Sequence, residues 1–393
     1  MKGKTVLLTG ATGIMGSWVL GEALAKGVRP VVIMRDENPQ RAQDRIDAVL
    51  RLIGKEQYRD RVRVVKGDAS RPNFGLASAL VDEFRSTLDA VLHCAASTSF
   101  NPSDDSDIWA TNVEGVSHVL NFVRGTDITL YHVSTAYIAG TYPGLSHEDV
   151  LDRQQEFNNT YERSKFESEG MVRRGLKNGD FQGAIFRPAI IVGATDTGKI
   201  SDFMNFYGFL RMADLASTRK GTGNTIVRVE ASPDVRVNLV PVDWTAKALW
   251  HIIEAEGASG HAYHLTNPNA HPVGELKDWV NTLIHDQGLR FELVDRLDDA
   301  TTTLENIAHN AFRHYRCYLK QQPDFDRTNT DRALNGTLPF PEIGPDTYSV
   351  LLDYARSQRW KGIFANSKVS ANGHTGSGRR ISTDYTPAAA VAN

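Results

Sequence analysis

The sequence predicts an α/β protein built on a doubly wound parallel sheet, followed by a smaller and less regular C-terminal part. In the first half of the 393 residues, short apolar runs rich in β-branched residues alternate with helical patterns. The first of these runs ends in a glycine-rich turn that leads directly into a helix. Continuous apolar strands separated by helices are typical of a parallel sheet that is covered on both faces.

The predicted elements follow one another from the N-terminus. Strands are expected at Lys4–Thr9, Val31–Met34, Val62–Val65, Ala90–His93, Leu130–Ser134 and Ala184–Arg187. Helices are expected at Ile14–Lys26, Arg41–Ile53, Ser106–Val123 and Tyr161–Arg174. Beyond Val192 the alternation weakens, and a strand-like segment at Val235–Pro241 and a helix at Trp244–Glu256 then return to it. This order predicts a Rossmann-like architecture.

Composition narrows the function classes. The chain has 44 Lys and Arg against 47 Asp and Glu, which gives a net charge of −3. The overall charge therefore gives no reason to expect binding to nucleic acid or to a membrane surface. Two cysteines exclude a disulfide framework and fit a reducing compartment. No apolar stretch approaches the roughly 18 residues that span a bilayer, and no signal-peptide pattern is present. We therefore expect a cytoplasmic protein without a transmembrane segment.

The glycine turn predicts a dinucleotide site. After Thr9 the chain reads Gly10-Ala11-Thr12-Gly13-Ile14-Met15-Gly16, between the first strand and the first helix. Gly10 permits a tight turn, Gly13 lets a pyrophosphate approach backbone N–H groups at the positive helix end, and Gly16 lets helix and sheet pack closely. We expect Thr9, Thr12, Ile14 and Met15 to contact the cofactor as well.

The end of the second strand favours NADP(H) over NAD. Arg35 follows Met34 at the position where an NAD site usually carries a carboxylate, and a guanidinium there can pair with a 2′-phosphate. Arg45 in the next helix supplies a second positive charge. Asp36 could instead serve as the carboxylate of an NAD site, so NAD remains the alternative. Asp68 is expected to bond the adenine amino group.

Two further short segments are expected along the dinucleotide. Ala95 and Ala96, after the fourth strand, are expected to pass close to it. Asn112 is expected either to hold a backbone carbonyl or a water for proton relay, or only to stand near a helix start.

A second motif predicts acid–base chemistry. Tyr161 and Lys165 are four residues apart, so on a helix they share a face, and the ammonium is expected to lower the phenol pKa. The phenol can then give or take the proton of a carbonyl or alcohol. Ser134 and Thr135 close the fifth strand, where a hydroxyl can stabilise charge on a substrate oxygen. The pattern STAYIAG makes Thr135 the first candidate for this catalytic hydroxyl and Ser134 the second.

Six motifs can be compared with known families: TGATGIMG, HCAAS, TNVEG, YHVSTAY, YERSK and FRPAIIVG. As a set they resemble the extended short-chain dehydrogenase/reductase superfamily over residues 4–265. A narrower likeness is to fatty acyl-CoA reductases and to the thioester-reductase domains of carboxylic acid reductases and nonribosomal peptide synthetases. It rests on Gly67-Asp68, Pro72-Asn73-Phe74-Gly75-Leu76, Arg187-Pro188 with Gly193, and the run Asn238–Asp243. This resemblance implies a place for Pro188 beside the cofactor.

The resemblance also implies an activity, the NADPH-dependent reduction of an acyl thioester to the aldehyde, with possible further reduction to the alcohol. The thioester would arrive on CoA or on a separate acyl or peptidyl carrier protein. Three alternatives stay open: an aldehyde or ketone reductase or alcohol dehydrogenase, a sugar-nucleotide epimerase or dehydratase, and a non-catalytic NADP-binding regulator.

The domain organisation follows from these motifs. Residues 1–192, with a returning segment at about 235–265, are expected to form the NADP-binding domain. Residues 193–234 and 266–364 are expected to bind or cap the substrate, with a mostly helical stretch at 298–344, and 365–393 to form a disordered tail. The aromatic cluster of Phe203, Phe206, Tyr207 and Phe209 is expected mainly to pack a core, with an acyl pocket as the alternative. The basic residues Arg211, Arg219, Lys220 and Arg228 are either surface charges or contacts for the phosphates of CoA or phosphopantetheine.

Overall fold

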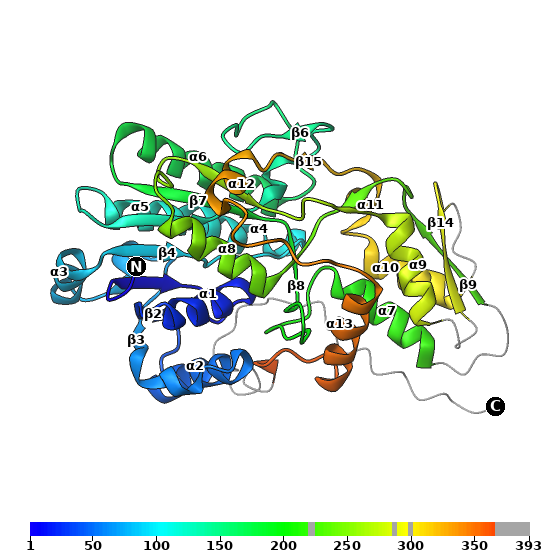
Figure 1. The fold of residues 1–393 in the computed structure, drawn as a ribbon, viewed down its shortest axis with the longest axis horizontal. Helices are drawn as coiled ribbons and strands as arrows, with labels where there is room; N and C mark the ends of the chain where they lie inside the picture. The colour runs from blue at the N-terminus through cyan, green and yellow to red at the C-terminus, as the bar shows by residue number, and fades with distance from the viewer. Residues whose placement is uncertain (219–224, 285–288, 298–301, 366–393) are drawn as a thin grey trace.

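A computed structural model describes residues 1–218, 225–284, 289–297 and 302–365 of the chain. Its centre is a seven-stranded sheet in the order β12-β7-β5-β4-β1-β2-β3, in which every neighbouring pair is parallel (Figure 1). The strands are β1 (Thr5–Thr9), β2 (Arg29–Met34), β3 (Arg63–Lys66), β4 (Ala90–His93), β5 (Thr129–Val133), β7 (Gly183–Pro188) and β12 (Ala262–Leu265). The sheet confirms the predicted doubly wound α/β fold.

Helices cover both faces of the sheet because its strands are apolar on both sides. In β1, Val6 and Leu8 belong to one buried core and Leu7 to the other. The first core packs against α1 (Ile14–Ala25), α2 (Pro39–Ile53) and α8 (Val242–Glu254). The second core packs against α3 (Ser78–Thr87), α5 (Gly115–Val123) and α6 (Thr160–Asn178). Short α4 (Asp105–Trp109) precedes α5, with a π-helical turn at Ala110–Glu114 between them.

The segment predicted as one strand at Val235–Pro241 is two strands with different partners. β10 (Arg236–Val237) pairs antiparallel with β13 (His271–Pro272), and β11 (Leu239–Pro241) pairs parallel with β8 (Ile190–Val192). The chain changes partner at Asn238, whose amide group bonds the backbone N–H and C=O of Asn267 instead of continuing one ladder. A single strand was therefore the wrong prediction.

A second group of elements lies at the other end of the molecule, to the right in Figure 1. It comprises α7 (Tyr207–Thr218), β9 (Thr225–Glu230), α9 (Val273–Leu283), β14 (Leu289–Val294), α10 (Thr303–Phe312), α11 (Arg316–Lys320) and α13 (Pro345–Ser357). β9 and β14 form a parallel pair, and α7 and α9 pack near it around an apolar core. Residues 193–234, expected to be irregular, thus contain a helix and a strand.

The remaining elements pack against segments that are distant from them in the sequence. β6 (Leu145–Ser146) pairs in parallel with β15 (Asp324–Phe325), and α12 (Thr328–Leu334) packs against α8 and β12. From residue 366 onward the expected tail lies outside the described residues. Within the described ranges, no helix has the length and apolar character needed to cross a membrane.

Candidate active site

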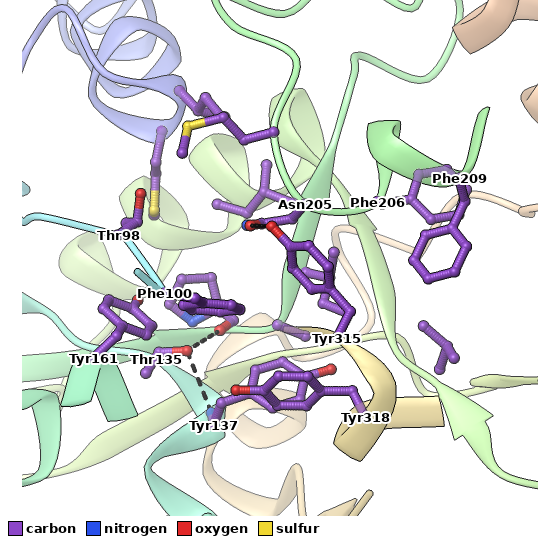
Figure 2. A pocket seen from close by; sticks show the side chains of 18 of the residues that line it. Thr98, Phe100, Thr135, Tyr137, Tyr161, Asn205, Phe206, Phe209, Tyr315 and Tyr318 are labelled. Carbon is purple, nitrogen blue, oxygen red and sulfur yellow. Dashed lines mark hydrogen bonds between the residues drawn. The ribbon is translucent and has the colours of Figure 1, made fainter. Parts of the chain in front are cut away.

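One cavity of about 400 Å³ runs from the carboxyl edge of the central sheet into the second group of elements. The glycine turn and the ends of β4, β5 and β7 line one part of it, which is where ligands bind in a doubly wound sheet. Figure 2 shows Tyr161 and Thr135 on one side, with Phe206 and Phe209 on the opposite side. Residues from both ends of the molecule therefore face the same space.

At Gly10 and Gly16 of the glycine turn, a side chain would clash with the neighbouring protein backbone. Gly10 has φ of +71°, and a Cβ atom there would lie 2.7 Å from the Ala95 nitrogen. A Cβ atom at Gly16 would lie 2.1 Å from the Gly10 carbonyl oxygen. Gly13 stands at the N-cap of α1, and Thr12, Ile14 and Met15 line the cavity beside it. This cradle of small residues at a helix N-terminus fits the pyrophosphate of a dinucleotide.

Two predicted cofactor residues, Thr9 and Asn112, hold the backbone near the turn and do not line the cavity. The Thr9 hydroxyl bonds His93 Nδ1 at 2.8 Å and accepts the Ala95 N–H, so Thr9 joins β1 to β4. Asn112 is fully buried in the π-helical turn, and its amide bonds both the N–H and the C=O of Ser97. Asn112 thus holds a backbone segment and does not stand at a helix start. Its amide also donates to the Ser164 hydroxyl.

The other predicted contacts differ in their relation to the cavity. Ala96 lines it, whereas Ala95, one residue earlier, and Asp68 do not. The Asp68 carboxylate accepts hydrogen bonds from the N–H and hydroxyl of Ser70. Pro188 lines the cavity, and its carbonyl accepts a hydrogen bond from Thr135 at 3.4 Å.

Positive charge gathers beyond the end of β2. Arg35 is exposed, and Arg45 donates to the Thr12 hydroxyl at 3.3 Å while its guanidinium lies 4.9 Å from the Phe364 ring centroid. Burial lowers the pKa of Arg45. The Asp36 carboxylate accepts a backbone N–H in the following turn and lies 3.8 Å from Arg41 Nε. Asp36 is therefore held by the start of α2.

The predicted reacting groups come together. Tyr161 and Lys165 lie on α6, and Ser134 and Thr135 follow β5; all four line the cavity. The Thr135 hydroxyl accepts the Tyr137 N–H at 3.3 Å, as Figure 2 shows. Ser134 is buried, and its hydroxyl has no hydrogen-bond partner within the described part of the chain. The Thr135 hydroxyl and the Tyr161 phenol thus come together at one part of the cavity, and Ser134 lies next to Thr135.

The pKa values of Tyr161 and Lys165 move in opposite directions. Burial raises the pKa of Tyr161 to about 12, although its hydrogen bond with Thr135 lowers it, and the Glu162 charge adds to the rise. Burial lowers the pKa of Lys165 to about 8, against the effects of Glu169 and Cys94. The Lys165 ammonium donates to the Val133 carbonyl at 2.8 Å. The pKa of Tyr161 thus lies above its ordinary value, not below it as the four-residue spacing predicts.

Sequence reasoning missed an aromatic wall beside Tyr161. The Phe100 ring lies 5.8 Å from Tyr161, 5.4 Å from Tyr315 and 5.9 Å from Tyr318, measured between centroids (Figure 2). The Tyr137 ring stands edge-on to Tyr318 at 5.5 Å. Tyr137 was visible within the STAYIAG motif, whereas the other aromatic residues lie in segments without a recognisable pattern.

Glu162, next to Tyr161, is a second residue that the sequence did not single out. It is fully buried, and burial raises its pKa. Its carboxylate accepts a 2.5 Å hydrogen bond from the Tyr318 hydroxyl and a 2.8 Å bond from the Asn158 N–H. Glu162 therefore ties α11, from the C-terminal third, to the first turn of the helix that carries Tyr161.

The aromatic cluster after residue 200 has both of its expected roles. Phe206 and Phe209 line the cavity, while Phe203 and Tyr207 pack into the surrounding core. The Tyr207 hydroxyl accepts the Gly193 N–H at 2.9 Å.

The basic residues expected near the same region have different surroundings. Neither Arg211 nor Arg228 lines the cavity, and Arg228 pairs with Glu305 at 2.6 Å. Arg219 and Lys220 lie outside the described residues.

Comparison with known proteins shows which sequences are similar to this chain. The family model described as male sterility protein matches residues 8–249. Over 90% of its length the chain is 25% identical to the non-canonical nonribosomal peptide synthetase FrzA of Cladobotryum sp, and over 74% it is 25% identical to the L-2-aminoadipate reductase of Saccharomyces cerevisiae. The chain spans 36% and 22% of the lengths of these two relatives.

Solved structures share the fold. The terminal R domain from the myxalamid PKS-NRPS biosynthetic pathway has a TM-score of 0.75 at 22% identity, covering 92% of both chains. A thiolation-reductase di-domain from an archaeal non-ribosomal peptide synthetase has a TM-score of 0.71 at 20% identity, covering 91% of this chain and 76% of that one. The UDP-glucuronic acid 4-epimerase of Bacillus cereus, bound to NAD, has a TM-score of 0.64 at 13% identity, covering 90% and 99%.

Proposed function

Because the chain belongs to the male sterility protein family of the extended short-chain dehydrogenases/reductases, we propose that it is an NADPH-dependent reductase of acyl thioesters. The observation that carries the proposal is the single cavity that joins the glycine cradle, the hydroxyls of Thr135 and Tyr161, and a mainly apolar chamber. The matched relatives named as a peptide synthetase and an aminoadipate reductase support the thioester chemistry.

The residues present fit the cofactor. Backbone N–H groups of the turn between Gly10 and Gly16 would hold the pyrophosphate, and Arg35 and Arg45 would pair with the 2′-phosphate. Along the rest of the nucleotide we assign contacts to Thr9, Thr12, Ile14, Met15, Asp68, Ala95, Ala96, Asn112 and Pro188. Bound NADPH supplies a hydride to the carbonyl carbon of the substrate.

The side chains around that carbonyl stabilise the negative charge that develops on its oxygen. The hydroxyls of Thr135 and Tyr161 donate hydrogen bonds to it, with Ser134 as a further donor, and so stabilise the tetrahedral oxyanion. At neutral pH Tyr161 is protonated, since its pKa is about 12. Collapse of the oxyanion restores the C=O bond, breaks the C–S bond and releases a thiolate, which takes its proton from the Tyr161 phenol, and a proton from solvent then restores the phenol. The products are an aldehyde and a thiol, and the aldehyde can enter the same site for reduction to the alcohol.

Lys165 acts on this reaction through its charge. With a pKa of about 8 the ammonium is mostly protonated at neutral pH, although it is buried. Beside the nicotinamide ribose it would orient the cofactor, and its charge would stabilise the phenolate that Tyr161 becomes.

The second group of elements supplies the acyl site. We assign substrate binding to residues 193–234 and 266–364, and NADP binding to 1–192 with the returning segment at about 235–265. The thioester would enter on CoA or on an acyl or peptidyl carrier protein. The shared fold of the thiolation-reductase di-domain supports the carrier alternative.

The test is NADPH oxidation by the purified protein with a panel of acyl-CoA and acyl-pantetheine thioesters, free aldehydes and nucleotide sugars. We expect thioesters to be reduced with release of one thiol per aldehyde. Tyr161→Phe should lower kcat about 10²- to 10⁴-fold. Tyr142→Phe, outside the cavity lining, serves as the matched control. Turnover of aldehydes alone, or of no thioester, would contradict the proposal.

A further inference from the structure

The chain after α13 brings an aromatic side chain from the C-terminal third to the cofactor end of the cavity. Figure 1 shows this segment running from α13 toward α2. Phe364, which lies in it, is half-buried and lines the same cavity as Gly10, Thr12 and Gly13. The glycine cradle therefore has a neighbour from the opposite end of the sequence.

Hydrogen bonds hold the backbone just before Phe364. The Trp360 indole N–H donates to the Asp214 carboxylate at 2.7 Å, and the Ile363 N–H donates to the Ser201 carbonyl at 3.0 Å. Ser201 itself lines the cavity. The position of the Phe364 ring is therefore set by tertiary contacts of the residues that precede it.

The Phe364 ring lies against one of the two arginines assigned to the 2′-phosphate. The guanidinium carbon of Arg45, on α2, lies 4.9 Å from the ring centroid, and Arg45 Nη2 donates to Thr12 Oγ1 at 3.3 Å. Burial lowers the pKa of Arg45, the Asp36 charge opposes this effect, and the Arg35 charge adds to the lowering. Arg35 and Arg45 are thus near enough to repel each other, as two groups that bind one anion would be.

We propose that Phe364 is a positioning residue of the cofactor site, which holds the Arg45 guanidinium in the orientation that bonds the 2′-phosphate of NADPH. This inference rests on the proposed function and concerns its cofactor selectivity. An aromatic ring attracts the flat face of a guanidinium, so the N–H donors at the edge stay available for a phosphate. Because the ring orders the arginine before the cofactor arrives, less side-chain freedom is lost on binding. Phe364 thus favours NADPH over NADH without contacting the phosphate.

Fluorescence titration with NADPH and with NADH tests the inference without turnover. Phe364→Leu keeps an apolar side chain but removes the aromatic face, whereas Phe364→Tyr keeps that face. We expect Phe364→Leu to raise the Kd for NADPH about three- to tenfold and the Kd for NADH less than about twofold. Phe364→Tyr should bind both cofactors as the wild-type protein does. A residue that only supported the fold of the site would change both dissociation constants together.

A double-mutant cycle shows whether Phe364 acts through Arg45. In an Arg45→Ala background, Phe364→Leu should not weaken NADPH binding further, because the group that the ring positions is already absent. Tyr58→Leu is the matched control. The Tyr58 ring is also half-buried and carries an arginine, Arg61, at 5.0 Å from its centroid, but it does not line the cavity. Tyr58→Leu should leave both dissociation constants unchanged.

Three results would overturn the inference: an unchanged Kd for NADPH in Phe364→Leu, an equal loss of affinity for both cofactors, or the same loss in the Arg45→Ala background as in the wild type. Each of them leaves the proposed function standing if the wild-type protein binds NADPH more tightly than NADH. A wild-type protein without that preference would instead contradict the cofactor of the proposed function, and this inference with it.

Discussion

At the scale of single residues, Lys165 shows how burial changes the chemistry of a side chain. Lys165 is 1% exposed, and its ammonium bonds one backbone carbonyl, that of Val133. Desolvation disfavours the charged form of an amine, and here it lowers the pKa from 10.5 to about 8. The protein thus keeps a buried positive charge on α6, one helical turn after Tyr161, at a cost to its own stability.

This cost predicts opposite pH dependences for stability and activity. Between pH 8 and 10.5 the unfolded chain keeps the Lys165 proton and the native protein loses it, so the unfolding free energy rises with pH. Relative to Lys165→Met, the wild-type protein should gain about 3 kcal/mol over this range. Its kcat should fall over the same range, since the ammonium is lost.

Denaturant unfolding and kcat, measured at several pH values on both proteins, check this prediction. A stability difference that stays constant from pH 8 to 10.5 would show that Lys165 is not the group that titrates.

A substitution at Arg45 tests whether the protein prefers NADPH to NADH. Arg45→Ala should raise KM for NADPH about 10- to 100-fold, because a charged hydrogen bond to the 2′-phosphate contributes about 1.5–3 kcal/mol. KM for NADH should change little. Steady-state kinetics with both cofactors checks this, and Arg51→Ala, exposed on the last turn of the same helix, is the control. An equal rise for both cofactors would mean that Arg45 supports the fold of the site instead of binding the phosphate.

At the scale of elements, the glycine turn depends on the absence of one side chain. In Gly16→Ala the added Cβ would lie 2.1 Å from the Gly10 carbonyl oxygen, so α1 must move away from the turn. We expect a lower melting temperature and a loss of NADPH binding of at least tenfold. Gly208→Ala in α7 has open space around the new methyl group and should stabilise the protein by up to about 1 kcal/mol. Calorimetric titration with NADPH and thermal unfolding of both variants test the difference.

The same scale shows what the sequence can predict. Strands such as β1 and β5 carry a local apolar run, so their positions and the hydroxyls that follow them were predictable. β12 was not predicted as a strand, because its four residues become one only against β7. Tyr315 and Tyr318 have no local signal; their place beside Phe100 results from tertiary packing of α11. The carboxyl ends of β1 and β5 were thus predictable, and most of the opposite cavity wall was not.

At the scale of the whole molecule, buried charges join segments that are far apart in the sequence. Arg187 of β7 and Glu169 of α6 are both fully buried and bonded at 2.6 Å, and Arg187 also contacts His264 of β12. The neighbouring Glu148 is buried too and accepts hydrogen bonds from the His264 N–H and the Thr330 hydroxyl of α12. This network connects α6, the sheet edge at β12 and α12 from the C-terminal third of the chain.

Removing one member of this network should be strongly destabilising. Glu169→Gln leaves the Arg187 guanidinium buried without a counter-charge, which should lower the unfolding free energy by about 3–5 kcal/mol. Arg173→Ala removes the partly exposed partner of the same carboxylate and should cost less. Urea unfolding of the two variants gives the comparison; equal losses would mean that burial of Arg187 is not the cause.

The pH dependence of the same pair has the same sign as that of Lys165, since stability rises with pH in both cases, but it lies in the acid range. Burial raises the pKa of Glu169, but the guanidinium groups of Arg187 and Arg173 outweigh it and hold the pKa well below its usual value. The contribution is complete above pH 4.5 and is lost as the pH falls further. The stability gap between wild type and Glu169→Gln should therefore narrow in acid.

The continuous cavity also has a consequence for how the protein is made. Its wall includes Gly10 near one end of the sequence and Phe364 near the other. Ribosomes add about 5–20 residues per second, and N-terminal parts fold first. The glycine turn and the first strands thus leave the ribosome tens of seconds before the last residues of the wall. Until then the apolar lining is exposed to solvent, where chaperones or other nascent chains can bind it. A premature stop before α13 would therefore expose this surface permanently and yield an aggregation-prone product, even though the cofactor turn had already formed.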